Sequence, residues 1–125
     1  MPNIGLSQLR KAFSSLQEGY RPNPSELERD GIIQRFEFTV ELCWKTSKKI
    51  LAENSITVDV PKNVFRELAQ LGWIDNAEIW MEFINARNKA SHIYNEQVAQ
   101  EVFSVIPGLL IEAKKLIDLL ESKIK

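Results

Sequence analysis

Residues 87–94 (Arg-Asn-Lys-Ala-Ser-His-Ile-Tyr) gather side chains that could perform acid–base chemistry on a phosphodiester. His92 is the one histidine of the chain. An imidazole exchanges its proton near neutral pH, so it can take the proton of a ribose 2′-hydroxyl. Arg87 can hold a phosphate by two hydrogen bonds and stabilise the charge that develops on it. With Asn88 or Ser91 orienting the scissile group, the segment allows RNA cleavage without a metal ion.

The same residues also fit a structural interpretation, in which His92 only stabilises a helix end. Local chemistry alone favours this interpretation, because a single histidine near a capping residue and a partly buried arginine is usually structural. Neither a catalytic-triad spacing nor a metal-ligand spacing supports the catalytic alternative. The sequence also has no glycine-rich phosphate loop, no pair of cysteines and no acidic cluster. We therefore expect no metal and no cofactor, and the residues by themselves leave both interpretations open.

The composition is that of a soluble globular protein with a single domain, residues 1–125. Hydrophobic residues make up 44% of the chain and charged residues 26%, which excludes a disordered chain. The net charge of −1 provides no broad field for nucleic acid, so any such contact must come from a local patch. Cys43 has no disulfide partner and is expected to be buried. Because no apolar run approaches the roughly 20 residues of a membrane span and no signal peptide opens the chain, we expect a cytoplasmic protein without membrane contact.

Apolar residues recur every three or four positions along most of the chain, which predicts helices. The stripe of the first helix consists of Leu6, Leu9, Phe13, Leu16 and Tyr20. The second helix runs to about Glu53 and starts either at Ile32, after Asp30-Gly31, or at a capping box formed by Ser25 and Glu28. A short third helix begins at Pro61 and ends before Gly72, which suits a left-handed cap.

The fourth helix is expected to start at Asp75, which repeats the capping-box spacing with Glu78. Its core stripe consists of Ile79, Phe83, Ala86, Ala90 and Ile93. Asn95 is expected to cap a last long helix, and Pro107-Gly108 should kink that helix because proline frees a carbonyl. Short connections between long helices favour antiparallel neighbours. The sequence therefore predicts an all-α, up-and-down bundle of about four main helices plus a short helix.

The second helix has more apolar surface than one core contact requires. Its core stripe consists of Ile33, Phe36, Val40, Trp44, Ser47 and Leu51. Phe38 and Leu42 lie off this stripe, roughly a third of a turn away. A second packing partner is therefore expected, and the simplest candidate is a neighbouring subunit.

Helical geometry relates the polar residues of the 87–94 segment to one another. On a straight helix, Arg87 and Tyr94 lie within roughly 20° of one another, with Ser91 close to the same line. This line borders the core stripe, so both Arg87 and Tyr94 should be partly buried. Asn88 and His92 form a second polar line, and His92 should face water or another chain. The directions of Arg87 and His92 differ by roughly 140°, so they share a site only if the helix bends, the arginine reaches around or a second subunit closes the cleft.

Other residues also have both a structural and a functional interpretation. Glu37 and Glu41 lie four apart and could assist polar contacts near the cleft, but Glu41 also forms an ordinary helix ion pair with Lys45. The tryptophans are interpreted as core or interface anchors, because no basic residues alternate with them as on a base-stacking surface. They are Trp44, Trp73 and Trp80.

Two stretches of the sequence resemble the HEPN family of small, all-helical proteins. The first is Arg87-x-x-x-x-His92-x-Tyr94, with polar Asn88 after the arginine. The second is residues 34–45 (Gln-Arg-Phe-Glu-Phe-Thr-Val-Glu-Leu-Cys-Trp-Lys), together with Trp80 ahead of Arg87. Joined, they resemble the branch of nucleotidyltransferase substrate-binding (HepT-like) proteins, which are often encoded beside a minimal nucleotidyltransferase (MNT). The resemblance covers about residues 30–100, while the two terminal helices match only in pattern.

This resemblance implies a homodimer in which the arginine and histidine of two chains face one cleft. In the toxin branch that cleft cuts RNA, and Arg87 and His92 match the active pair. The partner nucleotidyltransferase silences such toxins by AMP transfer to the tyrosine that Tyr94 matches. The resemblance therefore implies a toxin–antitoxin pair in which this chain is a metal-independent ribonuclease.

Two alternatives stay open. In the substrate-binding branch, a chain of this kind holds a nucleotide or substrate for its partner enzyme and breaks no bond. The other alternative is a purely structural helical adaptor. Nucleotide binding without RNA cleavage would favour the binding module, whereas an Arg87→Ala change that disturbs only folding or dimerisation would favour the adaptor.

Overall fold

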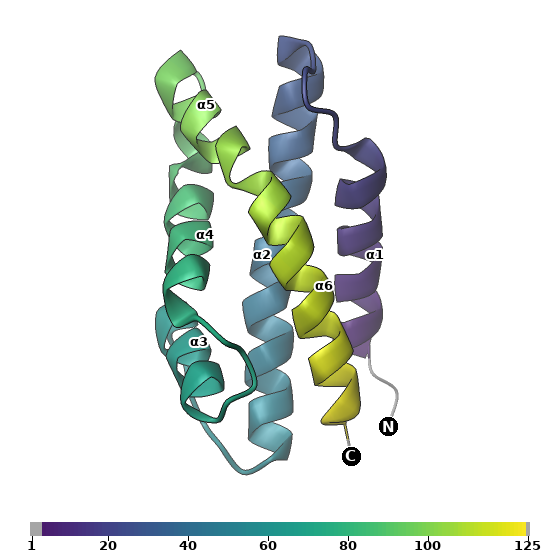
Figure 1. The fold of residues 1–125 in the computed structure, drawn as a ribbon, viewed down its shortest axis with the longest axis vertical. Coiled ribbons are helices and arrows are strands. Elements are labelled where there is room, and N and C mark those ends of the chain that lie inside the picture. The colour runs from purple at the N-terminus through teal and green to yellow at the C-terminus, as the bar shows by residue number, and fades with distance from the viewer. Residues whose placement is uncertain (1–3, 125) are drawn as a thin grey trace.

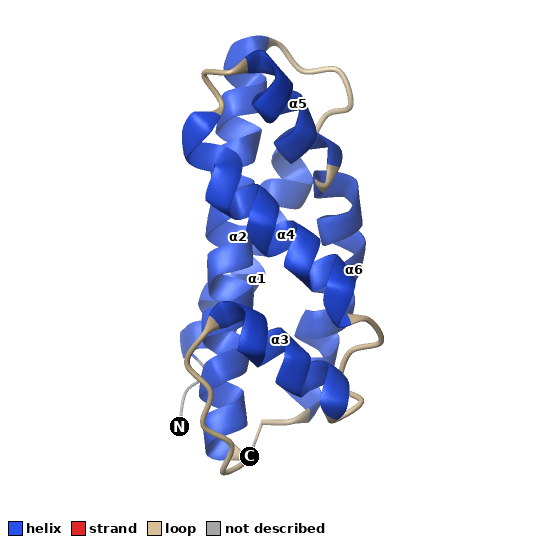
Figure 2. Ribbon diagram, turned by 90° about the vertical axis from the view of Figure 1, so that its left-hand side faces the viewer, coloured by secondary structure: helices blue, strands red, loops and turns tan. Residues whose placement is uncertain are grey.

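A computed structural model describes residues 4–124 as a bundle of helices (Figure 1). The elements in chain order are α1 (Ile4–Gly19), α2 (Glu26–Glu53), α3 (Pro61–Gln70), α4 (Ala77–Lys89), the 3₁₀ helix η1 (Ala90–His92), α5 (Glu96–Ser104) and α6 (Ile106–Ser122). Residues 4–124 contain no strand (Figure 2). The all-α fold predicted from the sequence is therefore confirmed.

The long helix α2 is the central element, because it contacts every other helix. In Figure 1, α1 lies on one side of α2, α3 and α4 lie on the other, and α6 crosses in front. The chain runs up α1, down α2, up α4 and down α5 and α6. This is the predicted up-and-down order, with α3 as the short additional helix.

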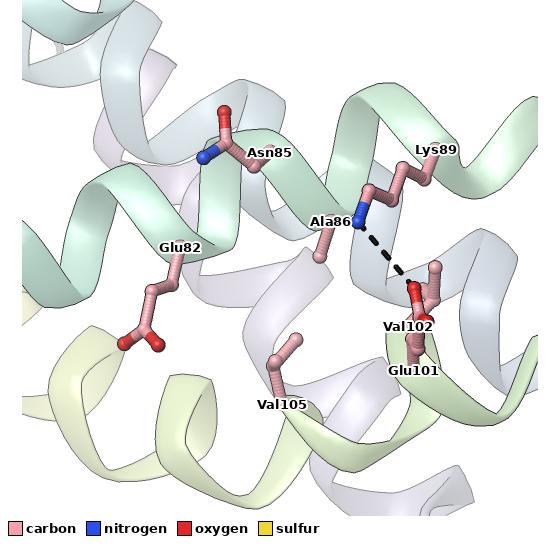
Figure 3. A pocket seen from close by; sticks show the side chains of 7 residues that line it. All are labelled: Glu82, Asn85, Ala86, Lys89, Glu101, Val102 and Val105. Carbon is pink, nitrogen blue, oxygen red and sulfur yellow. Dashed lines mark hydrogen bonds and ion pairs between the residues drawn. The ribbon is translucent and has the colours of Figure 1, made fainter. Parts of the chain in front are cut away.

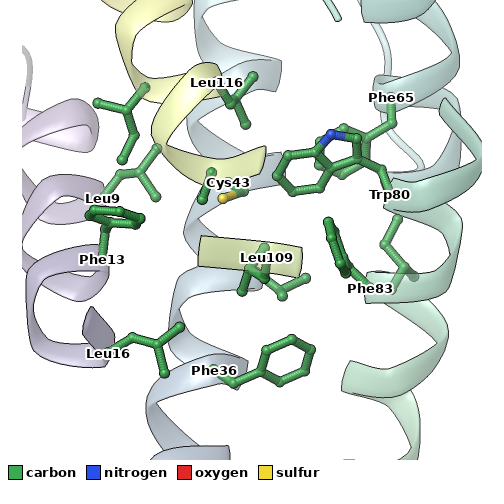
Figure 4. Packing of buried hydrophobic residues seen from close by; sticks show 14 of the residues in the cluster. Leu9, Phe13, Leu16, Phe36, Cys43, Phe65, Trp80, Phe83, Leu109 and Leu116 are labelled. Atoms are coloured by element: carbon green, nitrogen blue, oxygen red, sulfur yellow. The ribbon is translucent and has the colours of Figure 1, made fainter. Parts of the chain in front are cut away.

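The core is formed by apolar side chains from α1, α2, α3, α4 and α6 that meet around α2 (Figure 4). The largest of those that are fully buried are Leu9, Leu16, Ile33, Phe36, Leu51, Phe65, Leu68, Trp80, Phe83, Ile106, Leu109 and Leu116. Cys43 is fully buried among them, and burial raises the pKa of its thiol. Cys43 is therefore a small core residue, as its position in an apolar pattern predicted.

Helix starts follow local capping chemistry, with one correction. The capping box at the start of α2 is present: the Glu28 backbone N–H donates to Ser25 Oγ at 3.1 Å, and the Ser25 N–H donates to Glu28 Oε1 at 2.9 Å. Gly31 lies inside α2 and does not delay its start. The predicted cap at Asp75 is wrong: Asn76 caps α4 instead, and its Oδ1 accepts the Glu78 N–H at 2.8 Å. Asn76 has the extended backbone that an N-cap requires, so α4 begins one residue after it.

The last predicted helix is broken into two. Asn95 caps α5 as expected, accepting backbone N–H bonds from Gln97 and Val98. α5 then ends at Ser104, and Pro107 lies in the first turn of α6, where its missing N–H costs nothing. The proline therefore starts a new helix, and the predicted kink within one continuous helix is wrong.

None of the helices in residues 4–124 combines the length and the apolar character needed to span a membrane.

Candidate functional site

The 87–94 segment is not a continuous α-helix. α4 ends at Lys89, and η1 follows at Ala90–His92. The Asn95 N–H then donates to the His92 carbonyl at 3.1 Å, which closes a turn before α5. Because the straight helix ends before Ser91, Arg87 and Tyr94 do not share one line. The prediction that Tyr94 is partly buried is wrong: Tyr94 is 85% exposed.

Arg87 is half-buried, as predicted, and an ion pair fixes its direction. Its Nη2 lies 2.8 Å from Oε1 of Glu41 on α2, and its side chain is 38% exposed. Glu41 is itself held by two neighbours on α2: Lys45 Nζ lies 3.0 Å from its Oε2, and the Trp44 indole N–H donates to its Oε1 at 3.3 Å. Glu41 therefore makes the helix ion pair with Lys45 and also contacts the candidate catalytic arginine.

Two carboxyl groups beside Arg87 have opposite pKa shifts. Burial raises the pKa of Glu41, but its contacts with Lys45 and Trp44 and the charge of Arg87 outweigh burial and bring the pKa below its ordinary value. Burial raises the pKa of Glu37, and the charge of Arg87 opposes this only in part. Arg87 is therefore paired with the carboxylate that ionises more readily.

His92 and Tyr94 form a second, exposed group. The Tyr94 hydroxyl lies 3.4 Å from His92 Nδ1, and the two rings meet edge to face with centroids 5.9 Å apart. Both side chains are exposed, as is Ser91. The expectation that His92 faces outward is confirmed.

Among residues 4–124, no hydrogen bond or ion pair joins Arg87 to His92. Arg87 is directed toward α2, whereas His92 contacts the tyrosine of the turn. The structure thus brings Arg87 together with Glu41 and His92 together with Tyr94, as two neighbouring groups on one short segment.

A cavity of about 170 Å³ lies beside Arg87, between α2, the start of α3 and α4. Residues that line it include Glu41, Trp44, Pro61, Ile84, Arg87 and Asn88. Asn88, a candidate supporting residue, thus lies at the cavity that Arg87 borders. Among residues 4–124, no group accepts a hydrogen bond from the Nε of Arg87, which is itself buried.

A different cavity, of about 320 Å³, lies between α4 and α5 on another face of α4 (Figure 3). Its apolar wall is formed by Ala86, Val102 and Val105, and Lys89 Nζ lies 3.4 Å from Oε2 of Glu101 beside it. Neither Arg87 nor His92 borders this cavity.

A family model described as "nucleotidyltransferase substrate binding protein like" matches residues 5–122. The chain belongs to this family. The probable ribonuclease HepT of Haemophilus influenzae is 33% identical to it over 98 residues, which cover 74% of this chain and 67% of that protein.

Two solved structures share the fold of this family member. A protein from Thermus thermophilus superposes with a TM-score of 0.85 at 30% identity, covering 90% of this chain and 98% of that one. HI0074 of Haemophilus influenzae superposes with a TM-score of 0.80 at 29% identity, covering 93% of this chain and 98% of that one. Its structure is described as revealing the fold of a substrate binding domain of a nucleotidyltransferase. The resemblance to the nucleotidyltransferase substrate-binding branch is thus confirmed.

The structure places residues beside Arg87 whose contact with it could not be predicted from the sequence, and Glu41 and Pro61 are two examples. Glu41 was recognised as a polar residue near the cleft, but its pairing with Arg87 depends on the packing of α2 against α4. Pro61 reaches the cavity through the start of α3, and its only local signal was for a helix start. Neither contact follows from spacing along the chain.

Proposed function

We propose that this chain is the ribonuclease subunit of a toxin–antitoxin pair, which cuts RNA as a homodimer without a metal ion and is silenced by AMP transfer from a nucleotidyltransferase partner. The proposal rests on one observation about two neighbouring groups of side chains. Arg87 is ion-paired with Glu41 at a cavity, and five positions later in the chain His92 is exposed and in contact with Tyr94. That a relative is named a probable ribonuclease supports it.

In the proposed reaction, His92 takes the proton of a ribose 2′-hydroxyl as general base. The 2′-oxygen forms a bond to phosphorus and the bond to the 5′-oxygen breaks, which gives a 2′,3′-cyclic phosphate and a 5′-hydroxyl. The imidazolium returns the proton to the leaving oxygen. Arg87 stabilises the negative charge that builds on the phosphate oxygens, and Asn88 and Ser91 orient the scissile group.

The purified chain, incubated with single-stranded RNA in EDTA, should produce fragments with 2′,3′-cyclic phosphate ends. Mass spectrometry of the products identifies these ends directly. Cleavage that appears only after Mg²⁺ is added, or products with 3′-hydroxyl ends, would contradict the proposed chemistry. Nucleotide binding without cleavage would instead support the second candidate, a substrate-binding subunit, which the description of HI0074 favours.

The homodimer is proposed to form through Phe38 and Leu42 on α2. Phe38 is 54% exposed and Leu42 is half-buried, so the structure leaves this apolar face uncovered by its own helices. Phe38 lies about 60° around the helix from Glu41, the ion-pair partner of Arg87. A second copy packed on this face therefore lies next to the residues that hold Arg87, where it can bring a second His92 toward the same cleft.

Phe38→Glu is expected to make the protein monomeric, because it places two charges in the centre of a two-fold apolar contact. Light scattering after size-exclusion chromatography measures the mass. Leu27→Glu is the matched control, since Leu27 is an apolar residue in the first turn of α2 that is 84% exposed and lies about three helical turns before Phe38. If the Phe38→Glu protein has the same dimeric mass in solution as the unmodified protein, the dimer interface does not include Phe38.

Tyr94 is proposed as the acceptor of AMP. Its 85% exposure leaves the hydroxyl open to a partner enzyme. In the reaction, the Tyr94 oxygen attacks the α-phosphate of ATP, pyrophosphate leaves, and a base takes the phenolic proton. Because the hydroxyl lies 3.4 Å from His92, an attached AMP would occupy the space in front of the imidazole.

Incubation with ATP and the nucleotidyltransferase partner should add one AMP to Tyr94 and stop RNA cleavage. Peptide mass spectrometry locates the modification, and Tyr94→Phe should prevent it. The other tyrosine of the chain, Tyr20, is half-buried and stacked on Phe103, so it is an internal control. Addition of AMP to Tyr20 would contradict this assignment. So would a Tyr94→Phe protein that takes up as much AMP as the unmodified protein.

A further inference from the structure

We propose that the cavity beside Arg87 is a nucleobase-binding subsite in which Trp44 forms the stacking surface. The choice of an RNA base as ligand rests on the proposed function. The size, the lining residues and the charged groups of the cavity between α2, α3 and α4 support the subsite itself.

The walls of the cavity suit a flat apolar ring. Trp44 is half-buried at the cavity, and Pro61 and Ile84 are apolar residues that line it with Trp44. The volume of about 170 Å³ is slightly larger than that of a cavity of about 150 Å³ known to hold a benzene molecule. One six-membered ring therefore fits, which is the size of a pyrimidine base.

The three tryptophans of the chain differ in what surrounds their rings. Trp80 is 1% exposed and is stacked on Phe65 within the core. Trp73 lies under Lys123, whose Nζ is 5.1 Å from its ring. Trp44 also has a lysine near its ring, Lys45, but it lines a cavity together with Arg87 and Asn88. Unpaired RNA bases are recognised by stacking on such aromatic side chains.

Polar groups at the cavity can read the edge of a base. The exposed Asn88 amide offers both a donor and an acceptor, which a base edge can use together. The guanidinium of Arg87, which also lines the cavity, carries further N–H donors. The cavity therefore combines one stacking surface with hydrogen-bonding groups, as recognition of a single-stranded base requires.

Two cationic side chains, both ion-paired with Glu41, lie at or near the cavity and could contact the phosphate attached to the base. The Arg87 guanidinium borders the cavity, and Lys45 Nζ lies 6.0 Å from the centroid of the Trp44 ring. The sequence showed no basic residues alternating with the tryptophans, but α4 supplies Arg87 to Trp44 of α2 in space. A base stacked on Trp44 thus has its phosphate beside the arginine proposed to stabilise the scissile group.

The proposed subsite and the proposed dimer face are compatible. On α2, Trp44 and Phe38 lie on opposite flanks of Glu41, about 120° apart around the helix. A second copy seated on Phe38 and Leu42 therefore leaves the Trp44 side of the helix open to a nucleotide.

The test compares uridine 5′-monophosphate with ribose 5-phosphate, which carries the same phosphate and sugar without a base. Isothermal titration of the full chain is expected to give roughly 10-fold tighter binding of the nucleotide, the contribution of one stacked base. Trp44→Leu should remove this difference, while Trp73→Leu, the matched control, should keep it. Asn88→Ala, at an exposed position that folding does not depend on, should reduce the difference as well.

Equal affinity for the two ligands in the unmodified protein would overturn the subsite. So would a nucleotide preference that survives in both Trp44→Leu and Asn88→Ala. Because no bond is broken in this assay, the chain can fail to cut RNA and still show the preference, in which case only the ribonuclease proposal fails.

Discussion

His92→Ala is expected to slow RNA cleavage by about 10²–10⁴-fold, the contribution of a general acid or base. Among the candidate residues, the imidazole is the group proposed to take the proton of the ribose 2′-hydroxyl as a general base. Because His92 is exposed and contacts only Tyr94 among the polar side chains described, its loss should change the free energy of unfolding by less than about 0.5 kcal/mol. Single-turnover cleavage of a labelled RNA measures the rate, and thermal unfolding measures the stability.

The controls for this prediction distinguish proton transfer from contact with RNA. His92→Gln keeps a hydrogen-bonding side chain but cannot transfer a proton, so it should be as slow as the alanine variant. Gln97→Ala removes an exposed polar residue of α5, five positions after His92 in the chain, and should leave the rate unchanged. Cleavage by His92→Ala at the rate of the unmodified protein would remove the histidine from the mechanism and leave the binding module as the better proposal.

The helices were predictable because their signals are local. A capping box at Ser25 and Glu28, a proline at the first turn of α3 and Gly72 with its φ of 75° each specify the backbone within a few residues. The apolar stripes then determine which face of each helix enters the core, and Leu9, Phe36 and Phe83 are buried as their spacing predicts.

The geometry of the 87–94 segment was not predictable by the same reasoning, because two local signals conflict there. Asn95 as an N-cap requires an extended residue, and its φ of −86° and ψ of 118° show one. A helix that continued straight to Tyr94 would leave no room for the turn before that cap. In the structure Asn95 forms the cap and α4 ends at Lys89. Tyr94 therefore lies in solvent and not at the edge of the core, where it was expected.

The surroundings of Arg87 also needed the structure, since they depend on contacts between distant parts of the chain. Spacing along the sequence identifies Lys45 as a partner for Glu41, because the two lie one helical turn apart. It cannot identify Arg87, which reaches the same carboxylate only because α4 packs beside α2. The same packing turns Trp44 from an expected core anchor into part of the wall of a cavity.

The packing that positions α4 depends most on Trp80, so Trp80→Ala is expected to be the most destabilising of the substitutions considered for this chain. The ring is 1% exposed, stacks on Phe65 of α3 at 4.5 Å and meets Phe83 edge to face at 5.1 Å. Removing a large buried aromatic side chain costs about 3–5 kcal/mol through lost apolar burial and the cavity left behind. Domains of this size have a total stability of roughly 5–15 kcal/mol, so a large part of the stability would be lost.

Urea denaturation followed by circular dichroism should show a lower midpoint concentration for Trp80→Ala. Thermal denaturation should show a melting temperature lower by roughly 10–20 °C. Trp80→Phe keeps a ring for Phe65 to stack on and should lose much less stability. Trp73→Ala, at a half-buried tryptophan outside this stack, is the second control. A Trp80→Ala protein as stable as the unmodified one would mean that α3 does not hold α4 through this stack. The position of Arg87, two helical turns further along α4, would then have to be fixed by Glu41 and the core residues of α2 alone.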